Sequence, residues 1–183
     1  VNGVCPSVYT NTFHVTVKPI PFVGYTFTQG CQGKSVSFIN TTTGANLYNW
    51  DFNDGNGSAV FSPTHIYQTS GVFQVKLTAT SANGCSDSIK QNVTIYAQPT
   101  VNFSVLDSAC GFKQLLFTNN SAILSGSISN YVWNFGDNTA ITTEVNPSHT
   151  YTVANTYKVK LVATSDMGCK DSITKPVEIF PKP

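Results

Sequence analysis

The stretch GVFQVKLTAT at residues 71–80 alternates apolar and polar side chains from Phe73 to Ala79. A period of two along the chain predicts a β-strand that buries one face. The stretch NTYKVKLVAT at residues 155–164 repeats this pattern from Tyr157 onward. The chain therefore contains the same long strand twice.

The repetition extends well beyond this strand. Cys31 and Phe38 match Cys110 and Phe117, and three further blocks recur in the same order: YNWDFND (48–54) with YVWNFGD (131–137), PTHIY (63–67) with PSHTY (147–151), and GCSDS (84–88) with GCKDS (168–172). A unit of roughly 80 residues is too long for a solenoid repeat, so each copy is predicted to be a small domain.

The predicted strands are short and are separated by turn-rich segments such as residues 53–57. Short strands at regular spacing predict an all-β protein built of β-sandwiches. We expect one domain at residues 20–97 and a second at residues 98–183, with the Pro-containing residues 97–100 as a stiff connector.

The first nineteen residues do not begin a domain in this interpretation. Residues 15–17 (VTV) resemble residues 93–95 (VTI) at the end of the first copy. Residues 1–19 are therefore interpreted as the C-terminal hairpin and last strand of a preceding, truncated repeat. The alternative is an irregular N-terminal arm.

The charge balance restricts the possible partners. Ten basic residues, all of them Lys, face nine acidic residues, which gives a formal net charge of +1. Nucleic-acid binding needs clustered basic side chains, so we expect no nucleic-acid partner. No apolar run approaches the ~20 residues needed to cross a bilayer, so we expect no membrane insertion. With no signal-peptide pattern, the chain is interpreted as an internal segment of a longer polypeptide.

The five cysteines follow the repeat. Cys31 and Cys85 belong to the first copy, and Cys110 and Cys169 occupy the same places in the second. We therefore predict the disulfides Cys31–Cys85 and Cys110–Cys169, one in each domain. Cys5 matches Cys85 and is expected to be unpaired here, with its partner further upstream. Structural disulfides indicate an oxidising compartment, at the cell surface or in the medium.

The blocks WDFNDG (50–55), PTHIY (63–67) and GVFQVKLTAT (71–80) closely resemble PKD (polycystic kidney disease) repeats. The resemblance covers both copies and implies a seven-stranded Ig-like β-sandwich in each. The second copy departs from the usual pattern at Asn134 and Asn155, and the first at Asn53. The GC-x-DS block resembles PKD units in large surface and gliding proteins of Bacteroidota.

Two groups of residues are candidate sites. Asp51, Asn53 and Asp54 cluster in one turn and could bind Ca²⁺ through oxygen atoms, as some bacterial PKD domains do. The alternative is that the turn carboxylates accept hydrogen bonds from backbone amides. Each of three serines follows Asp and precedes an apolar residue, a pattern that resembles Bacteroidota O-glycosylation sites, with ordinary hairpin hydrogen bonding as the alternative. These are Ser88, Ser108 and Ser172.

His65 and His149 recur in the same slot, but no nucleophile or carboxylate pair accompanies either by motif, so a structural role is expected. No nucleophile–base pair, metal cluster or phosphate loop appears, so we expect no enzymatic activity and no cofactor other than calcium.

Two functions remain. The first is a non-catalytic extracellular spacer or adhesive segment of a long cell-surface protein, similar to gliding-motility adhesins, with neighbouring repeats as partners. The second is an accessory module of a secreted enzyme that degrades polysaccharide or protein. Surface polysaccharide and other surface proteins are the external partners that these two functions imply.

Overall fold

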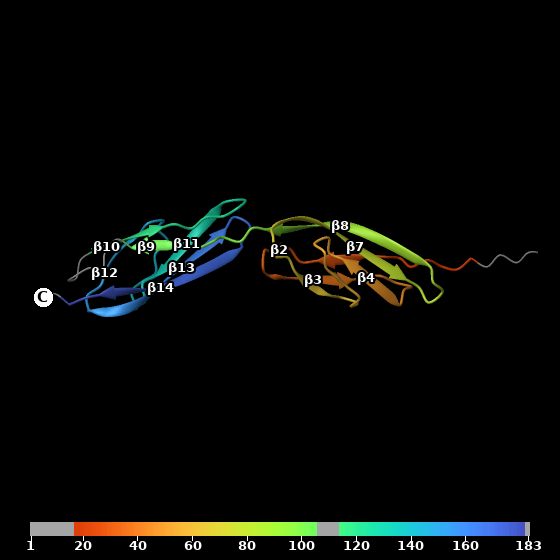
Figure 1. The fold of residues 1–183 in the computed structure, drawn as a ribbon, viewed down its shortest axis with the longest axis horizontal. Helices are drawn as coiled ribbons and strands as arrows, with labels where there is room; N and C mark the ends of the chain where they lie inside the picture. The colour runs from red at the N-terminus through yellow and green to blue at the C-terminus, as the bar shows by residue number, and fades with distance from the viewer. Residues whose placement is uncertain (1–16, 106–113, 182–183) are drawn as a thin grey trace, which may run out of the picture.

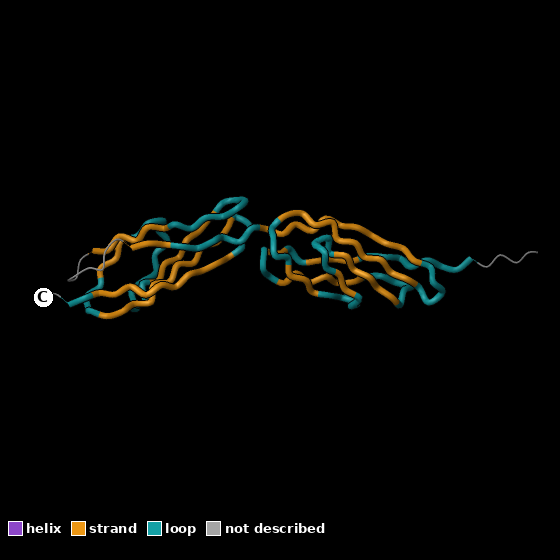
Figure 2. The backbone as a smooth tube through the Cα atoms, viewed as in Figure 1, coloured by secondary structure: helices purple, strands orange, loops and turns teal. Residues whose placement is uncertain are grey.

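The computed structural model describes residues 17–105 and 114–181. They form two elongated domains placed end to end, joined by a short connector (Figure 1). Every regular element in these residues is a β-strand, and the longer strands run along the length of each domain (Figure 2). No helix of the described part is long and apolar enough to span a membrane.

The first domain is a sandwich of two sheets. One sheet has the order β1 (Tyr25–Phe27), β3 (Ser35–Asn40), β6 (Thr64–Ile66). The other has the order β2 (Gly30–Cys31), β8 (Ser86–Tyr96), β7 (Gly71–Thr80), β4 (Leu47–Asp51), β5 (Gly57–Ser58). All pairs are antiparallel except β2 with β8, which is parallel.

The second domain repeats this arrangement. Its smaller sheet has the order β12 (Ser148–Thr150), β10 (Gln114–Asn119), β9 (Phe103–Val105). Its longer sheet has the order β11 (Ile128–Asn134), β13 (Asn155–Ser165), β14 (Lys170–Ile179). The predicted tandem of Ig-like β-sandwiches is confirmed.

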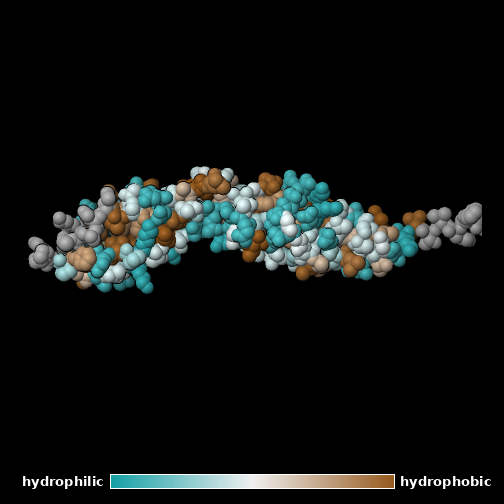
Figure 3. Space-filling model, in the orientation of Figure 1, coloured by the Kyte–Doolittle hydropathy of each residue, from teal (hydrophilic) through white to brown (hydrophobic). Residues whose placement is uncertain are grey.

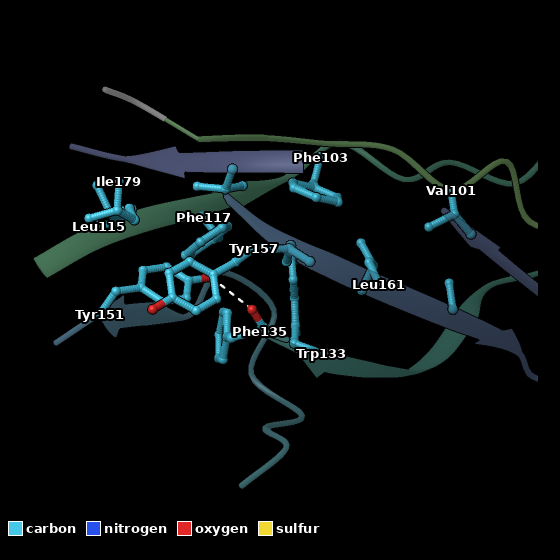
Figure 4. Close-up of a cluster of buried hydrophobic side chains, with 13 residues drawn as sticks. Val101, Phe103, Leu115, Phe117, Trp133, Phe135, Tyr151, Tyr157, Leu161 and Ile179 are labelled. Carbon is cyan, nitrogen blue, oxygen red and sulfur yellow. Dashed lines mark hydrogen bonds between the residues drawn. The ribbon is translucent and has the colours of Figure 1, made fainter. Parts of the chain in front are cut away.

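The alternating strands supply both cores. In β7, Val75, Leu77 and Ala79 are fully buried, and the equivalent residues of β13 are buried in the second domain. Figure 4 shows the second core, where Trp133 meets Phe103 edge-on with ring centroids 5.2 Å apart. The hydroxyl of Tyr151 there donates a 3.0 Å hydrogen bond to the carbonyl of Phe135. Each core is therefore a cluster of large aromatic rings between two sheets, and the burial of such rings is a large favourable contribution to folding.

The turn after the strand that carries the core tryptophan, β4 in the first domain and β11 in the second, needs a residue in the left-handed backbone conformation. Gly136 has φ +78°, and Asn53 adopts φ 61° at the same place in the first domain. Asn tolerates this conformation better than most residues, which explains why the first domain can do without glycine there. A Cβ on Gly136 would lie 2.7 Å from the carbonyl oxygen of Lys158.

Replacing Gly136 with Ala should destabilise the second domain by more than the ~1–2 kcal/mol that left-handed backbone alone costs a residue with a Cβ. The matched control is Gly168→Ala, because Gly168 also has positive φ but has open space around the added carbon. Urea unfolding of both variants measures the difference. Equal losses would show that the approach to Lys158 costs nothing.

Candidate functional site

The junction between the domains is unusually short. Tyr96 at the end of β8 still pairs with Cys31, and Thr100 already exchanges backbone hydrogen bonds with Ala122 of the second domain. Only residues 97–99 lie between these paired positions, and Ala97 is buried. A connector of three residues leaves the two domains little freedom to separate.

A disulfide crosses this junction. Cys31 of β2 is bonded to Cys169, which lies in the hairpin between β13 and β14, with the two Cα atoms 5.7 Å apart. The bond links residues separated by 138 positions. In the chain-entropy model a loop of that length is worth about 5 kcal/mol. The domains are therefore tied together at two points, the connector and the disulfide.

This bond shows that the predicted disulfides Cys31–Cys85 and Cys110–Cys169 are wrong. Cys31 is paired with Tyr96, the last residue of β8, whereas Cys85 directly precedes Ser86, the first residue of β8. The 11 residues of β8 span about 35 Å at the usual rise of a strand. Cysteines with Cα atoms more than ~7 Å apart cannot bond without backbone movement. Cys110 and Cys5 lie outside the described residues.

The junction also contains a cavity of about 430 Å³. Its first-domain wall comes from the start of β7 and the end of β8, and its second-domain wall from Ser125, Gly126 and the hairpin residues 165–167. The carboxylate of Asp166 holds the two second-domain segments together, because it accepts hydrogen bonds from the amide and hydroxyl of Ser127.

The turn that follows β4 in the first domain and β11 in the second contains the same contact between aspartate and histidine in both domains. Nε2 of His65 lies 2.7 Å from Oδ2 of Asp54, and His149 lies at the same distance from Asp137. Each imidazole stacks flat on a core phenylalanine, at 4.1 Å from Phe52 in the first domain. The histidines are therefore structural, as expected from the sequence.

The two aspartates are held in their charged form. Burial by itself would raise the pKa of the Asp54 carboxyl, but hydrogen bonds from His65 and Asn56 outweigh burial and leave its pKa below the ordinary 3.8. The pKa of Asp137 is lowered in the same way against burial, by hydrogen bonds from Thr139 and His149. The charged carboxylates thus fasten each turn to the histidine of the neighbouring strand.

The predicted turn hydrogen bonds are present. Asp51 accepts from the amide of Asn53, and Asp54 accepts from the amide of Asn56. Both oxygens of Asp54 already accept hydrogen bonds, so a calcium ion at Asp51, Asn53 and Asp54 would share these oxygens with their present donors. Within residues 17–105 and 114–181, no group of three or more His, Cys, Asp or Glu is placed to hold a metal ion. Calcium at this turn stays a prediction.

Two of the three serines that follow Asp lie in the hairpins formed by β7 with β8 and by β13 with β14. Ser88 in β8 and Ser172 in β14 are exposed, and the amide of Ser88 donates to the carboxylate of Asp87. Ser108 lies outside the described residues. O-glycosylation of these serines stays a prediction.

A family model described as "PKD domain" matches residues 25–96 and again residues 96–180. The chain belongs to the PKD domain family. The two matches meet at residue 96, so no spare linker separates the two PKD domains.

Solved structures of PKD domains are among the similar proteins. The PKD1 domain of Vibrio anguillarum Epp is 28% identical, with TM-score 0.42, and the match covers 47% of this chain and 96% of that one. The PKD1 domain of the Vibrio cholerae metalloprotease PrtV is 28% identical, with TM-score 0.41, covering 45% and 98%. Fibronectin(III)-like modules of Clostridium thermocellum CbhA are 14% identical, with TM-score 0.42, covering 87% and 95%.

Because the pKa of the Asp54 carboxyl is lowered in the folded protein, its contribution to stability is fully present at pH values well above 3.8 and is lost as the pH falls through the folded pKa. At neutral pH, Asp54→Asn should destabilise the first PKD domain by about 1 kcal/mol or more, because it weakens a charge-assisted hydrogen bond. Thermal unfolding at pH 7 and at pH ~2.5 should show that the variant loses less stability on acidification than the unmodified chain. The control is Asp87→Asn on the exposed hairpin. An equal acid response in all three chains would contradict this role.

Replacing Cys31 with Ser should lower the unfolding temperature of the oxidised chain and make the two PKD domains unfold separately, since it removes the cross-junction bond. Cys169→Ser should have the same effect, whereas Cys85→Ser should leave the unfolding temperature nearly unchanged. Differential scanning calorimetry measures both the temperature and the number of transitions. A wild-type profile for Cys31→Ser would mean that the bond does not couple the domains.

Proposed function

We propose that this chain is a non-catalytic, extracellular spacer or adhesive segment of a long cell-surface protein, to which it gives reach and mechanical stability. The tandem of PKD domains and the double connection between them support this function. The observation that carries the proposal is the disulfide between Cys31 and Cys169, because it lies across the junction instead of inside one core.

The position of the bond determines how the chain would bear tension. A pull on the N-terminal side enters the first domain at β1 and reaches Cys31 within a few residues. It then crosses to Cys169 and leaves along β14, which pairs with β13 over its whole length. The chain between the two cysteines, which are separated by 138 positions, is bypassed. Tension therefore does not extend β3 to β13, which include the tryptophan strands of both cores.

The segments that do carry the load are already extended. β14 is a strand of 10 residues that starts directly after Cys169, and β1 and β2 lead from the outer end of the first domain to the junction. A strand is close to the full length of its chain, so pulling on it releases little extra length. Such a route suits a protein that must keep its reach under force.

An accessory module of a secreted enzyme is the alternative, and it would need exposed aromatic rings to contact carbohydrate or protein substrate. Phe61 is half exposed and packs edge-on against Tyr48, with ring centroids 5.0 Å apart. On the face seen in Figure 3, hydrophobic residues form several separate small patches along both domains. Glycan-array binding that is lost in Phe61→Ala would favour the accessory function.

The spacer proposal makes a quantitative prediction for single-molecule pulling from both ends. The reduced chain should release its full contour length, whereas the oxidised chain should fall short by about 480 Å, which is the length of 138 residues at roughly 3.5 Å each. Cys31→Ser should behave as the reduced chain under both conditions, and Cys85→Ser should behave as the unmodified chain. Full extension of the oxidised chain would contradict the proposal.

A further inference from the structure

The hairpin that carries the bonded Cys169 has a counterpart in the first domain. In residues 165–169 the amide of Ser165 donates to the carbonyl of Cys169, and the amide of Gly168 donates to the carbonyl of Ser165. Residues 81–85 contain the same two hydrogen bonds, and Gly84 and Gly168 share a positive φ of 83° and 80°. The two hairpins therefore have the same backbone, with Cys85 at the position of Cys169.

The two hairpins differ in what surrounds the cysteine. Cys169 is 1% exposed, and its amide donates to the hydroxyl of Ser165. Cys85 is partly exposed and has no disulfide partner among the described residues. The hydroxyl of Ser81, the counterpart of Ser165, is buried and has no hydrogen-bond partner. A buried hydroxyl without a partner is rare in a folded protein. The hairpin 81–85 thus has the backbone of the hairpin 165–169, but no neighbouring domain is bonded to its cysteine among the described residues.

The chain also enters both domains in the same way. Thr100, which follows Pro99, exchanges two backbone hydrogen bonds with Ala122, and Phe22, which follows Pro21, exchanges two with Thr43. Residues 18–21 (KPIP) therefore stand before the first domain where residues 96–99 (YAQP) stand before the second. The outer end of the first domain has both parts of a junction: an incoming segment that ends in proline and a hairpin cysteine.

We propose that the hairpin 81–85 is a docking surface for the C-terminal end of another PKD domain, and that a disulfide closes this contact. The partner is a PKD domain with a cysteine at the position of Cys31. That cysteine lies beside the last residue of the strand equivalent to β8. This inference concerns the surface alone, and it applies equally to a spacer and to an accessory module.

The bond would form by thiol–disulfide exchange with a disulfide oxidant, such as oxidised glutathione. The Cys85 thiolate attacks the oxidant, and one glutathione leaves as a thiol. The partner thiolate then attacks the mixed disulfide, and the second glutathione leaves. Two protein S–H bonds and one oxidant S–S bond are broken, one protein S–S bond forms, and the two protons end on the released thiols.

The test inserts a second copy of residues 22–99 directly before Phe22 of the full chain, so that the Pro99 of the copy precedes Phe22 as it normally precedes Thr100. Cys5 and Cys110 are replaced with Ser, as is Cys85 of the inserted copy, which prevents mispairing. After oxidation in a glutathione redox buffer, peptide mapping should find nearly all Cys85 bonded to Cys31. The Cys31–Cys169 bond serves as the folding control in the same molecule.

Two variants identify which Cys31 is used. Cys31→Ser in the inserted copy should leave Cys85 free to react with a maleimide and should keep Cys169 bonded. Cys31→Ser in the original domain should keep Cys85 bonded and leave Cys169 free to react with the maleimide. The proposal is overturned if Cys85 stays reactive in the oxidised three-domain chain while Cys31–Cys169 has formed. It is also overturned if Cys85 becomes reactive with Cys31→Ser in the original domain but not with Cys31→Ser in the inserted copy.

Discussion

The disulfide between Cys31 and Cys169 is the constraint on which the relation of the two domains depends. A connector of three residues keeps the domains close, but a single tether still allows rotation about itself. A second tether at another point of the same interface removes much of that rotation. Because β2 lies beside the end of β8, the cysteine is held at the junction by backbone pairing. The relative orientation of the domains is therefore restricted by two covalent connections, the connector and the disulfide.

The fold could be predicted from the sequence because its signals are local. The alternation in β7 and β13 identifies a strand and its buried face, and the aromatic residues of β4 and β11 supply the rings that the strand must cover. These patterns depend only on neighbours along the chain. The repeat then predicts that the chain forms the same sandwich twice, and the two hydrophobic cores confirm this prediction.

The disulfide pairing could not be obtained in this way. A repeat shows which cysteines are equivalent, but equivalence does not show at which end of a sandwich each one lies. The decisive element is β2, a strand of two residues that runs parallel to β8. Two residues are too few to give a periodic signal, so its position was not predictable. Once β2 is placed, Cys31 and Cys85 lie at opposite ends of β8, and only a neighbouring domain can reach either of them.

The Asp–His turn was predictable in part. The acidic turn and the recurring histidine were visible as motifs, and the hydrogen bonds from backbone amides followed from the chemistry of Asp in turns. The contact between Asp54 and His65 depends on how the turn after β4 folds toward β6, which only the tertiary structure determines. The same imidazole covers the ring of Phe52 at the edge of the core. One side chain thus joins a polar turn to the aromatic stack.

The location of the bond has a consequence for cooperativity. A disulfide inside one domain restricts the unfolded state of that domain alone. A disulfide between neighbours restricts either domain only as long as the other is folded, because an unfolded neighbour offers no fixed anchor. Each domain therefore gains most when both are folded, and the cooperative unit grows from one domain to the pair. A local opening in one domain is therefore opposed by the intact fold of the next.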